Sequence, residues 1–256
     1  RFSFAGHNLP AIQPSELCKL IYIIALAWYL RFRSNYSSFK ALIGPFLLTL
    51  LPMGMILLEP DLGTVMLMMP VLFVMLFVAG ARAKHLLVII MLAVMVSPLM
   101  WLKMRPYQRT RISSVLLQNP KVQKLAEEHD FIGRVLVGTE FNPRKWRNDW
   151  GYHLIRSKYA VASGGAGGYG FRKGPFVKYN FLPERHNDFI FAAICHQWGF
   201  YGAAAVLGLY SLLVACGLGV ARGNTDPFGR LLAVGIVAMF TVEVLINVGM
   251  TIGLMP

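Results

Sequence analysis

Six long apolar runs constrain this chain more than any other feature of its sequence. About 20 consecutive apolar residues are needed to cross a membrane as a helix, and the runs approach or exceed that length. They cover residues 17–30, 41–58, 62–81, 86–102, 189–221 and 231–255. Hydrophobic residues make up 56% of the chain and charged residues only 14%, against about a quarter charged in soluble domains. We therefore predict an all-α, polytopic membrane helix bundle with about six spans.

A polar region, residues 103–188, separates the fourth run from the fifth. Its later part, residues 159–169, is apolar and rich in glycine, but it is too short to cross a membrane alone. We interpret this part as a partial helix. The sequence thus predicts one membrane domain, residues 1–256, that contains a large extracytoplasmic region at residues 103–188.

The short connections between the runs differ in charge, and this difference predicts orientation. The connection at residues 59–61 has no lysine or arginine, whereas three others are basic. Short loops rich in lysine and arginine stay in the cytoplasm, so we place these three inside and residues 103–188 outside. The basic residues are Arg31, Arg33 and Lys40, then Arg82 and Lys84, and then Arg222 and Arg230.

The predicted outer region is strongly basic. Residues 103–188 contain 16 Lys and Arg against 7 Asp and Glu. Loops longer than about 60 residues cross the membrane largely regardless of charge, so this excess does not contradict the orientation. A surface with this charge would attract anionic lipid headgroups, diphosphates or a partner protein.

Ionisable residues crowd against the start of the fifth run. Glu184, His186 and Asp188 lie within residues 182–191, just before the apolar stretch. Ionisable groups at a membrane boundary are costly and often functional, so this segment is the first candidate for chemistry. A second interpretation stays open, because Asp188 also has the position of a helix N-cap, whose side chain accepts bonds from free backbone N–H groups.

Glu16 and Lys19 form another candidate pair. Pro14 and Glu16 favour a helix start, and Lys19 follows three residues after Glu16, on the same helical face and inside the apolar run. Such a pair is more often structural than catalytic, because each charge makes the other tolerable in the membrane. Glu243 lies one helical turn from Asn247 in the last run, and we predict a structural hydrogen bond for it.

Arg109 and Arg111 stand just after the fourth run. Guanidinium groups match phosphate oxygens in bidentate fashion, so both residues are candidates for gripping a diphosphate; the alternative is anchoring in lipid headgroups. Residues 164–170 contain five glycines in seven positions, which allows the backbone to bend or to approach a ligand closely. The histidines show no metal-ligand spacing. A divalent cation such as Mg²⁺, bound between a diphosphate and a carboxylate, is compatible with the sequence but not required by it.

Taken together, the motifs resemble those of the SEDS family (shape, elongation, division and sporulation). Six of the family's motifs occur here in the family's order over nearly the whole chain. Each motif alone is weak, but six in order are hard to obtain by chance. The matching segments are residues 13–16 with Lys19, 60–64, 106–112, 163–170, 182–191 and 247–256.

This resemblance implies a peptidoglycan glycosyltransferase with about ten spans, of which the chain lacks the first three and the last. Such an enzyme polymerises lipid II at the outer face of the bacterial cytoplasmic membrane, beside a class B penicillin-binding protein; we expect no nucleic acid partner. Asp188 is then the general base of an inverting transfer. Substrate binding is assigned to Arg109, Arg111, Lys19, Glu16, Gln108, Glu184 and His186.

The chain departs from the family pattern in three places. His196-Gln197 stand where the family usually has two glutamates, Phe2 stands where it has tryptophan, and residues 117–150 look longer and more basic, with the charges of a short solvated helix. These differences indicate a divergent branch or an altered activity. Two other functions stay open: a flippase for lipid-linked precursors, which usually shows paired repeats that we do not find, and a non-catalytic scaffold for a transpeptidase.

Overall fold

The computed structural model describes residues 3–4, 7–8, 14–32, 36, 38–58, 62–149, 151–179, 181–182 and 188–255. The described chain is almost entirely helical. Its strands are β1 (Ser3–Phe4) and β2 (His7–Asn8), which pair antiparallel over two residues each. The predicted all-α class is confirmed.

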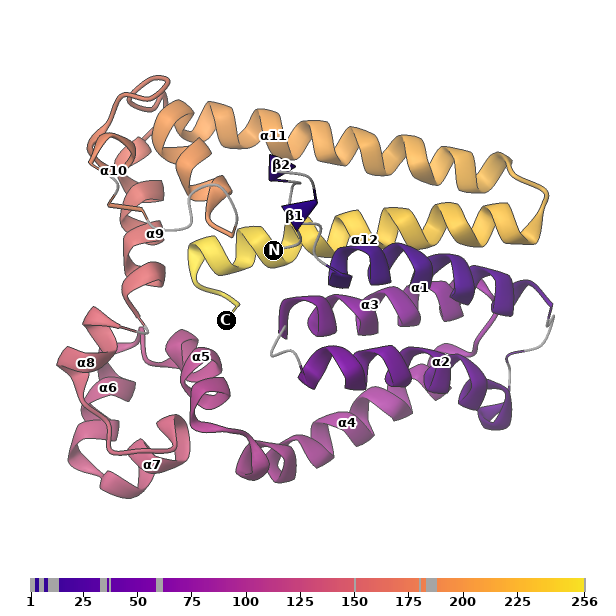
Figure 1. Ribbon diagram of the computed structural model, residues 1–256, viewed down its shortest axis with the longest axis horizontal. Helices are drawn as coiled ribbons and strands as arrows, with labels where there is room; N and C mark the ends of the chain where they lie inside the picture. The colour runs from indigo at the N-terminus through magenta and orange to yellow at the C-terminus, as the bar shows by residue number, and fades with distance from the viewer. Residues whose placement is uncertain are drawn as a thin grey trace. The chain divides into compact units, whose positions relative to one another are not determined.

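A helix occupies each of the six predicted apolar runs, as Figure 1 shows. By length and composition, α2, α4, α11 and α12 are able to cross a membrane. The other two, α1 and α3, are the shortest of the six, with 18 and 17 residues. The bounds are α1 (Pro14–Arg31), α2 (Phe39–Leu58), α3 (Leu62–Val78), α4 (Ala83–Lys103), α11 (Ile190–Gly223) and α12 (Pro227–Ile252).

Short helices occupy the described part of the predicted outer region. They are α5 (Pro106–Leu116), α6 (Pro120–Glu128), α7 (Asp130–Val137), α8 (Pro143–Asn148), α9 (Tyr152–Gly164) and α10 (Pro175–Lys178). Helix α6 confirms the short helix predicted within residues 117–150. Helix α9 covers residues 159–164 of the predicted partial helix, and residues 165–169 lie beyond its end.

Local sequence explains where several of these short helices begin. Proline opens α5, α6, α8 and α10, at a position whose N–H would lack a helical partner in any case. The Asn119 side chain caps α6 by accepting a bond from Lys121 N at 3.0 Å, and Asn142 caps α8 through Arg144 N at 3.0 Å. A common core joins α6, α7 and α8; its buried members are Leu117, Ala126, Val137, Phe141 and Trp146.

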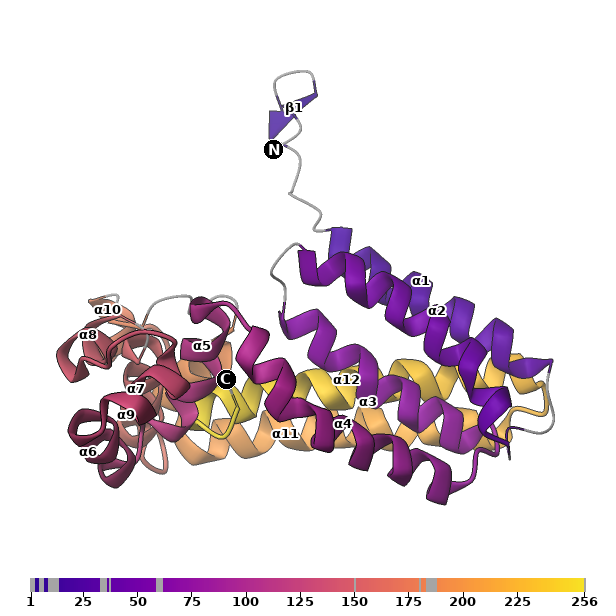
Figure 2. The ribbon, with the colours of Figure 1, turned by 90° about the horizontal axis from the view of Figure 1, so that it is seen from below.

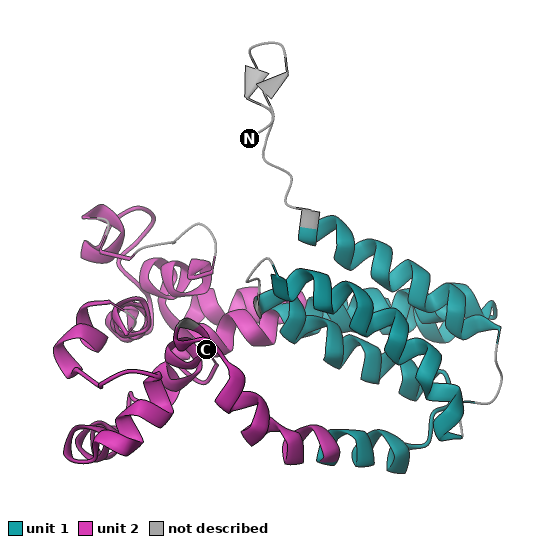
Figure 3. Cartoon of the chain, turned by 60° about the horizontal axis from the view of Figure 1, so that its bottom comes forward, with its two compact units in different colours: residues 1–91, 212–243 teal, residues 92–211, 244–256 magenta. Residues whose placement is uncertain are grey.

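The chain divides into two compact units, which Figure 3 colours separately. The first unit contains residues 1–91 and 212–243, and the second contains residues 92–211 and 244–256. Helices α1 to α3 therefore belong to the first unit, and α5 to α10 to the second. Each of α4, α11 and α12 contributes residues to both.

Helices α1, α2 and α3 pack side by side in the first unit (Figures 1 and 2). The buried Tyr22 of α1 joins all three, since its hydroxyl lies 3.1 Å from the Thr49 hydroxyl of α2 and 3.3 Å from the Met68 carbonyl oxygen of α3. A buried hydroxyl needs such partners because it has no water to bond. Tyr22 thus fixes the register of the three helices.

Pro98 interrupts the backbone bonding of α4. A proline leaves the carbonyl four residues earlier without its helical donor, and here that carbonyl belongs to Val94. The Ser97 hydroxyl donates to the Val94 oxygen at 2.8 Å. Serine and threonine side chains make prolines tolerable in membrane helices in this way.

Helix α11 differs from the uninterrupted span predicted for residues 189–221, because it breaks at Gly199, where φ is 62° and ψ is −155°. The glycine-rich segment at residues 164–170 takes over the backbone bonds that the break removes. Both segments belong to the second unit. The bonds run from Tyr169 N to His196 O (3.1 Å), Gly170 N to Gln197 O (2.8 Å), Phe200 N to Gly165 O (2.9 Å) and Tyr201 N to Ala166 O (3.2 Å).

Glycine is needed at the break because two backbones touch there. A Cβ added at Gly168 would overlap the Gln197 carbonyl, and one added at Gly199 would overlap the Ala166 carbonyl. Gly168 also has a φ of 72°, a conformation that other residues adopt at a cost. The sequence predicted that this segment bends or approaches a ligand; the structure shows that it approaches the backbone of α11.

Candidate functional site

The most buried charge in the first unit is Lys19 of α1. Its Nζ lies 2.7 Å from Glu16 Oε2 and 2.6 Å from Glu243 Oε1. The Lys19 side chain is 8% exposed, against 60% for Glu16 and 34% for Glu243. The predicted Glu16–Lys19 ion pair is therefore present, and a second carboxylate completes it.

Two different relationships bring these three groups together. Glu16 and Lys19 are three residues apart in α1, so the helix itself places them on one face. Glu243 comes from α12 and is 224 residues from Lys19 in the chain. The predicted structural hydrogen bond of Glu243 is present, but its partner is Lys19, which no local spacing could have revealed.

Two of the predicted substrate-binding residues of the second unit have structural partners. The Arg109 guanidinium donates through Nη2 to the Leu102 carbonyl at 2.6 Å and so stabilises the turn between α4 and α5. Its Nε is buried and lacks a partner among the described residues. Gln108 Oε1 accepts a bond from Arg105 N at 3.2 Å, which caps the start of α5. The Gln108 side-chain oxygen thus already has a partner, whereas Arg109 uses one of its five N–H donors.

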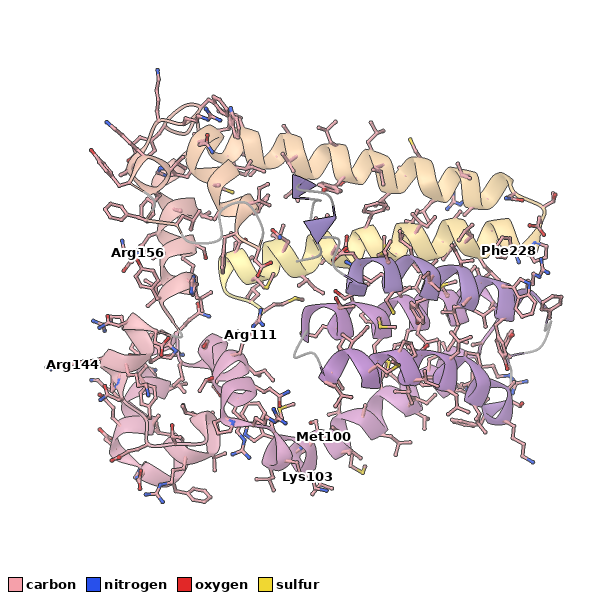
Figure 4. The ribbon with its side chains drawn as sticks, viewed as in Figure 1. Met100, Lys103, Arg111, Arg144, Arg156 and Phe228 are labelled. Atoms are coloured by element: carbon pink, nitrogen blue, oxygen red, sulfur yellow. The ribbon has the colours of Figure 1, made fainter. Side chains whose placement is uncertain are left out.

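Arg111 differs from Arg109 in its contacts. It lies on α5, where Figure 4 labels it, and it is half-buried. Within the described ranges no hydrogen bond or ion pair engages its guanidinium. An arginine in this state has all five donors available for an anion.

Asp188 stands in an exposed turn just before α11, which begins at Ile190. The first backbone bond of the helix runs from Ala193 N to Phe189 O at 3.2 Å, so Phe189 and not Asp188 occupies the cap position. No bond from the described residues reaches the Asp188 carboxylate. The predicted capping role is therefore not observed.

Neighbouring side chains fix the position of Asp188. Phe189 stacks on His153 of α9, with ring centroids 6.2 Å apart and an angle of 6° between the ring planes. Phe189 also packs against a small buried core that includes Leu182 and Ala192. The other two ionisable residues of the motif, Glu184 and His186, lie outside the described residues.

His196 and Gln197, which replace the family's usual glutamates, are both buried beside the break in α11. His196 Nδ1 lies 2.8 Å from the Ser163 hydroxyl, and Gln197 Oε1 accepts from Arg172 N at 2.8 Å. Ser163 and Arg172 lie on either side of residues 164–170, the segment whose backbone bonds to α11 at the break. Both side chains thus hold this segment against α11. This contact set, which sequence reasoning missed, gives the two residues a structural role.

No three His, Cys, Asp or Glu side chains lie close enough to hold a metal ion, as far as the described residues extend. A cation bridged by a diphosphate and one carboxylate would not need such a group.

Comparison with known proteins gives a consistent result. A sequence model of the FtsW/RodA/SpoVE family, described as cell cycle proteins, matches residues 8–256. Peptidoglycan glycosyltransferase RodA of Treponema pallidum (strain Nichols) is 30% identical over 301 residues, which cover 99% of this chain and 70% of that protein. Peptidoglycan glycosyltransferase MrdB of Escherichia coli (strain K12) is 33% identical over 95% of this chain and 60% of its own length.

A solved structure also resembles this chain. It comes from work on the coordination of polymerization and crosslinking by a peptidoglycan synthase complex. The similarity has a TM-score of 0.70 and 30% sequence identity, and it covers 98% of this chain and 63% of the other. The chain thus spans 60 to 70% of the length of these proteins.

Proposed function

Since this chain belongs to the FtsW/RodA/SpoVE family of cell cycle proteins, we propose that the protein to which it belongs polymerises lipid II into glycan strands. The chain is a multi-pass membrane segment of the bacterial inner membrane. We place the reaction at the outer face, in cell elongation or division. The names of the relatives from Treponema pallidum and Escherichia coli, both peptidoglycan glycosyltransferases, support this proposal.

Glycan polymerisation sets clear chemical requirements. The 4-hydroxyl oxygen of the acceptor sugar attacks the anomeric carbon of the donor, and the bond from that carbon to the lipid diphosphate breaks. The diphosphate leaves with the bonding electrons, and the hydroxyl proton needs an acceptor. A positioned base for this proton is worth about 10²–10⁴-fold in rate.

Asp188 is our candidate for the base, and its observed environment is the main support. Its carboxylate is exposed in the turn before α11, and no capping bond from the described part of the chain engages it. The stacking of Phe189 on His153 fixes the adjacent backbone. A carboxylate that is held in place but free of partners is suited to accept a proton from a bound hydroxyl.

Arg111 is our candidate for binding the diphosphate, and Arg109 contributes the guanidinium N–H donors that its bond to the Leu102 carbonyl leaves unused. Positive charge placed where negative charge develops is among the largest contributions to catalysis. Glu184 and His186 stay in the proposal as substrate-binding residues on the basis of their motif. Gln108 positions α5 through its bond to Arg105 N.

Lys19 and Glu16 are assigned to a positioning role. Lys19 is buried and its charge is already shared between two carboxylates, which leaves it little capacity for a diphosphate. We propose that Lys19, through its ion pair with Glu243, fixes α1 against α12 within the first unit. The likeness to a chain of a peptidoglycan synthase complex supports a partner, which we propose to be a class B penicillin-binding protein.

Reconstitution tests the proposed function. The full-length protein and its partner would be placed in liposomes with fluorescent lipid II on one face. Glycan polymer on a gel is the expected result. Movement of label to the other face without polymer would identify a flippase, and neither product would identify a scaffold; either outcome would refute the proposal.

A further inference from the structure

A cavity of about 690 Å³ lies in the second unit, bordered by α6, α8 and α9. This volume lies within the range of about 300–1,000 Å³ that is typical of small-molecule sites. Three basic side chains line the cavity, Arg147, Arg156 and Lys158, and none of the described carboxylates does. The proposed glycosyl transfer uses none of these residues, so the cavity calls for a separate explanation.

The three cations of the cavity keep their charge. In the part of the chain that the structure describes, the only basic residues in ion pairs are Lys19 and Arg134. Unpaired charges that converge on one cavity create a positive potential, which attracts an anion. The cavity is therefore suited to a negatively charged ligand, and three cations can serve more than one anionic group.

Neutral groups hold two of the cations in position. Lys158 Nζ donates to Gln118 Oε1 at 2.9 Å, which uses one of the three donors of an ammonium group. The Arg156 guanidinium, on α9 in Figure 4, lies 5.2 Å from the Tyr152 ring centroid and 5.4 Å from that of Phe181. Cation–π contacts of this kind orient an arginine without cancelling its charge or using its N–H donors. Both cations are thus positioned and still able to bind a ligand.

Amide side chains line the cavity beside the cations, among them Gln123 and Asn148. The Gln123 amide nitrogen donates to the Leu117 carbonyl at 2.7 Å, which fixes this side chain, while no hydrogen bond from the described residues engages its oxygen. A primary amide offers both donors and an acceptor. The lining can therefore pair with N–H and C=O groups of a ligand as well as with its negative charge.

This combination of groups favours an acidic peptide over other anions. The phosphate groups of lipids carry acceptor oxygens and no N–H donor, so the amide oxygens of the lining would find no partner on them. A lipid chain would also need a longer apolar groove, which these residues do not form. A peptide supplies carboxylates for the cations and N–H and C=O groups for the amides, and the rings of Tyr152 and Tyr159 provide apolar surfaces for its side chains.

We infer that this cavity binds an acidic peptide. The peptide of lipid II is one: an amide joins it to the muramic acid, but it keeps carboxylates at its isoglutamate residue and at its C-terminus. This choice of ligand rests on the proposed function. The cavity would then hold the peptide of the substrate or of the growing strand, while Asp188 and Arg111 act on the sugar and on the diphosphate.

Calorimetric titration of the full-length protein in nonionic detergent tests the inference. The probe is the lipid-free and sugar-free peptide L-Ala-γ-D-Glu-L-Lys-D-Ala-D-Ala, with both amino groups acetylated so that only its two carboxylates are charged. The same peptide with both carboxylates converted to amides, and soluble dihexanoyl phosphatidylglycerol, serve as comparison ligands. The acidic peptide should bind at least about tenfold more tightly than its diamide, because charge-assisted hydrogen bonds are about twice as strong as neutral ones. It should also bind more tightly than the lipid, which lacks peptide groups for the lining amides.

Two double variants remove cations from the cavity. Arg147→Gln/Arg156→Gln and Arg147→Gln/Lys158→Gln should each weaken binding of the acidic peptide by about tenfold or more, and the second pair covers the case in which loss of Arg156 disturbs the fold. Lys124→Gln/Arg144→Gln is the matched control, because it removes two exposed charges from the same region without touching the cavity. This control should bind the peptide as the parent does.

Three results would overturn the inference: no preference for the acidic peptide over its diamide, equal loss of binding in the control variant, or tighter binding of phosphatidylglycerol through the same residues. The last result would make the cavity a lipid headgroup site. The titration needs no enzymatic turnover, so the two proposals can fail separately. If polymer forms in liposomes but the peptide does not bind, only this inference fails; if the peptide binds but no polymer forms, only the proposed function fails.

Discussion

The buried Lys19 of the first unit and the candidate catalytic residues of the second unit differ in how their charges are paired. In the first unit, the buried Lys19 is matched by two carboxylates. In the second, Arg111 and Asp188 have no ion-pair partner among the described residues, where the only ion pair of that unit joins the exposed Arg134 and Asp130. Charge that is already neutralised can only hold the structure together, whereas unpaired charge is available for a substrate. This contrast is our basis for assigning structure to one set and function to the other.

Removal of Lys19 should have the largest effect on stability. Lys19→Ala leaves Glu16 and Glu243 close together without a counter-charge. Breaking a fully buried pair costs about 3–5 kcal/mol; because both carboxylates are partly exposed and screened by solvent, we expect a loss at or below the lower end of that range. We expect a markedly lower thermal unfolding temperature for the purified full-length protein, followed by tryptophan fluorescence. The triple variant Lys19→Met/Glu16→Gln/Glu243→Gln should recover most of the loss.

The exposed Arg134–Asp130 pair, with a distance of 2.7 Å, provides the control. Arg134→Ala should cost only about 0.2–1 kcal/mol, because exposed ion pairs contribute little. If Lys19→Ala proves as mild as Arg134→Ala, the distinction between the two units fails.

Substitution of Gly168, which contacts α11 at its break, should have the next largest effect on thermal stability. Gly168→Ala combines a positive φ, which costs roughly 1–2 kcal/mol for other residues, with overlap of the Gln197 carbonyl. Gly167→Ala, one position earlier, meets nothing within 4 Å and should be nearly neutral. Equal unfolding temperatures for the two variants would show that the glycine segment does not support the break.

A smaller effect is expected at Ser97. Ser97→Ala removes the donor to the Val94 carbonyl, and a lost hydrogen bond of this kind costs about 1 kcal/mol. In Pro98→Ala the backbone N–H regains that carbonyl, so adding Ser97→Ala to it should cost less. A double-mutant cycle on thermal unfolding measures this coupling, and additive effects would exclude it.

Interactions between residues close in the sequence could be predicted, whereas those between distant residues could not. The membrane helices were predictable because apolar length is a local property, and so was the Glu16–Lys19 pair at three residues' spacing. Glu243 as the partner of Lys19 was not, since 224 residues separate them. The break at Gly199 was visible in the sequence only as excess length, because the predicted span of residues 189–221 is longer than the about 20 residues that a membrane crossing needs. Where the helix breaks could not be predicted, because that depends on bonds to the glycine-rich segment at residues 164–170.

The candidate site was predictable in its chemistry more than in its contacts. Asp188 was expected at a helix start, and it does precede α11. The helix begins one residue later than a capping aspartate requires, with Phe189, which stacks on His153, at the cap position. Arg109 was expected to be free for a phosphate, yet it bonds the Leu102 carbonyl, a contact set by the turn between two helices.

The central claim is that Asp188 accepts the proton in glycan polymerisation, and the rate of polymer formation by Asp188→Asn tests it most directly. Asparagine keeps the shape but cannot act as the base, so the full-length variant with its partner should lose at least about 10²-fold in rate. Its unfolding temperature should hardly change, since the carboxylate makes no bond to the described chain. Asp149→Asn, which changes another exposed aspartate of the predicted outer region, should polymerise normally. Polymer made by a folded Asp188→Asn protein at more than roughly a tenth of the parent rate would contradict the account.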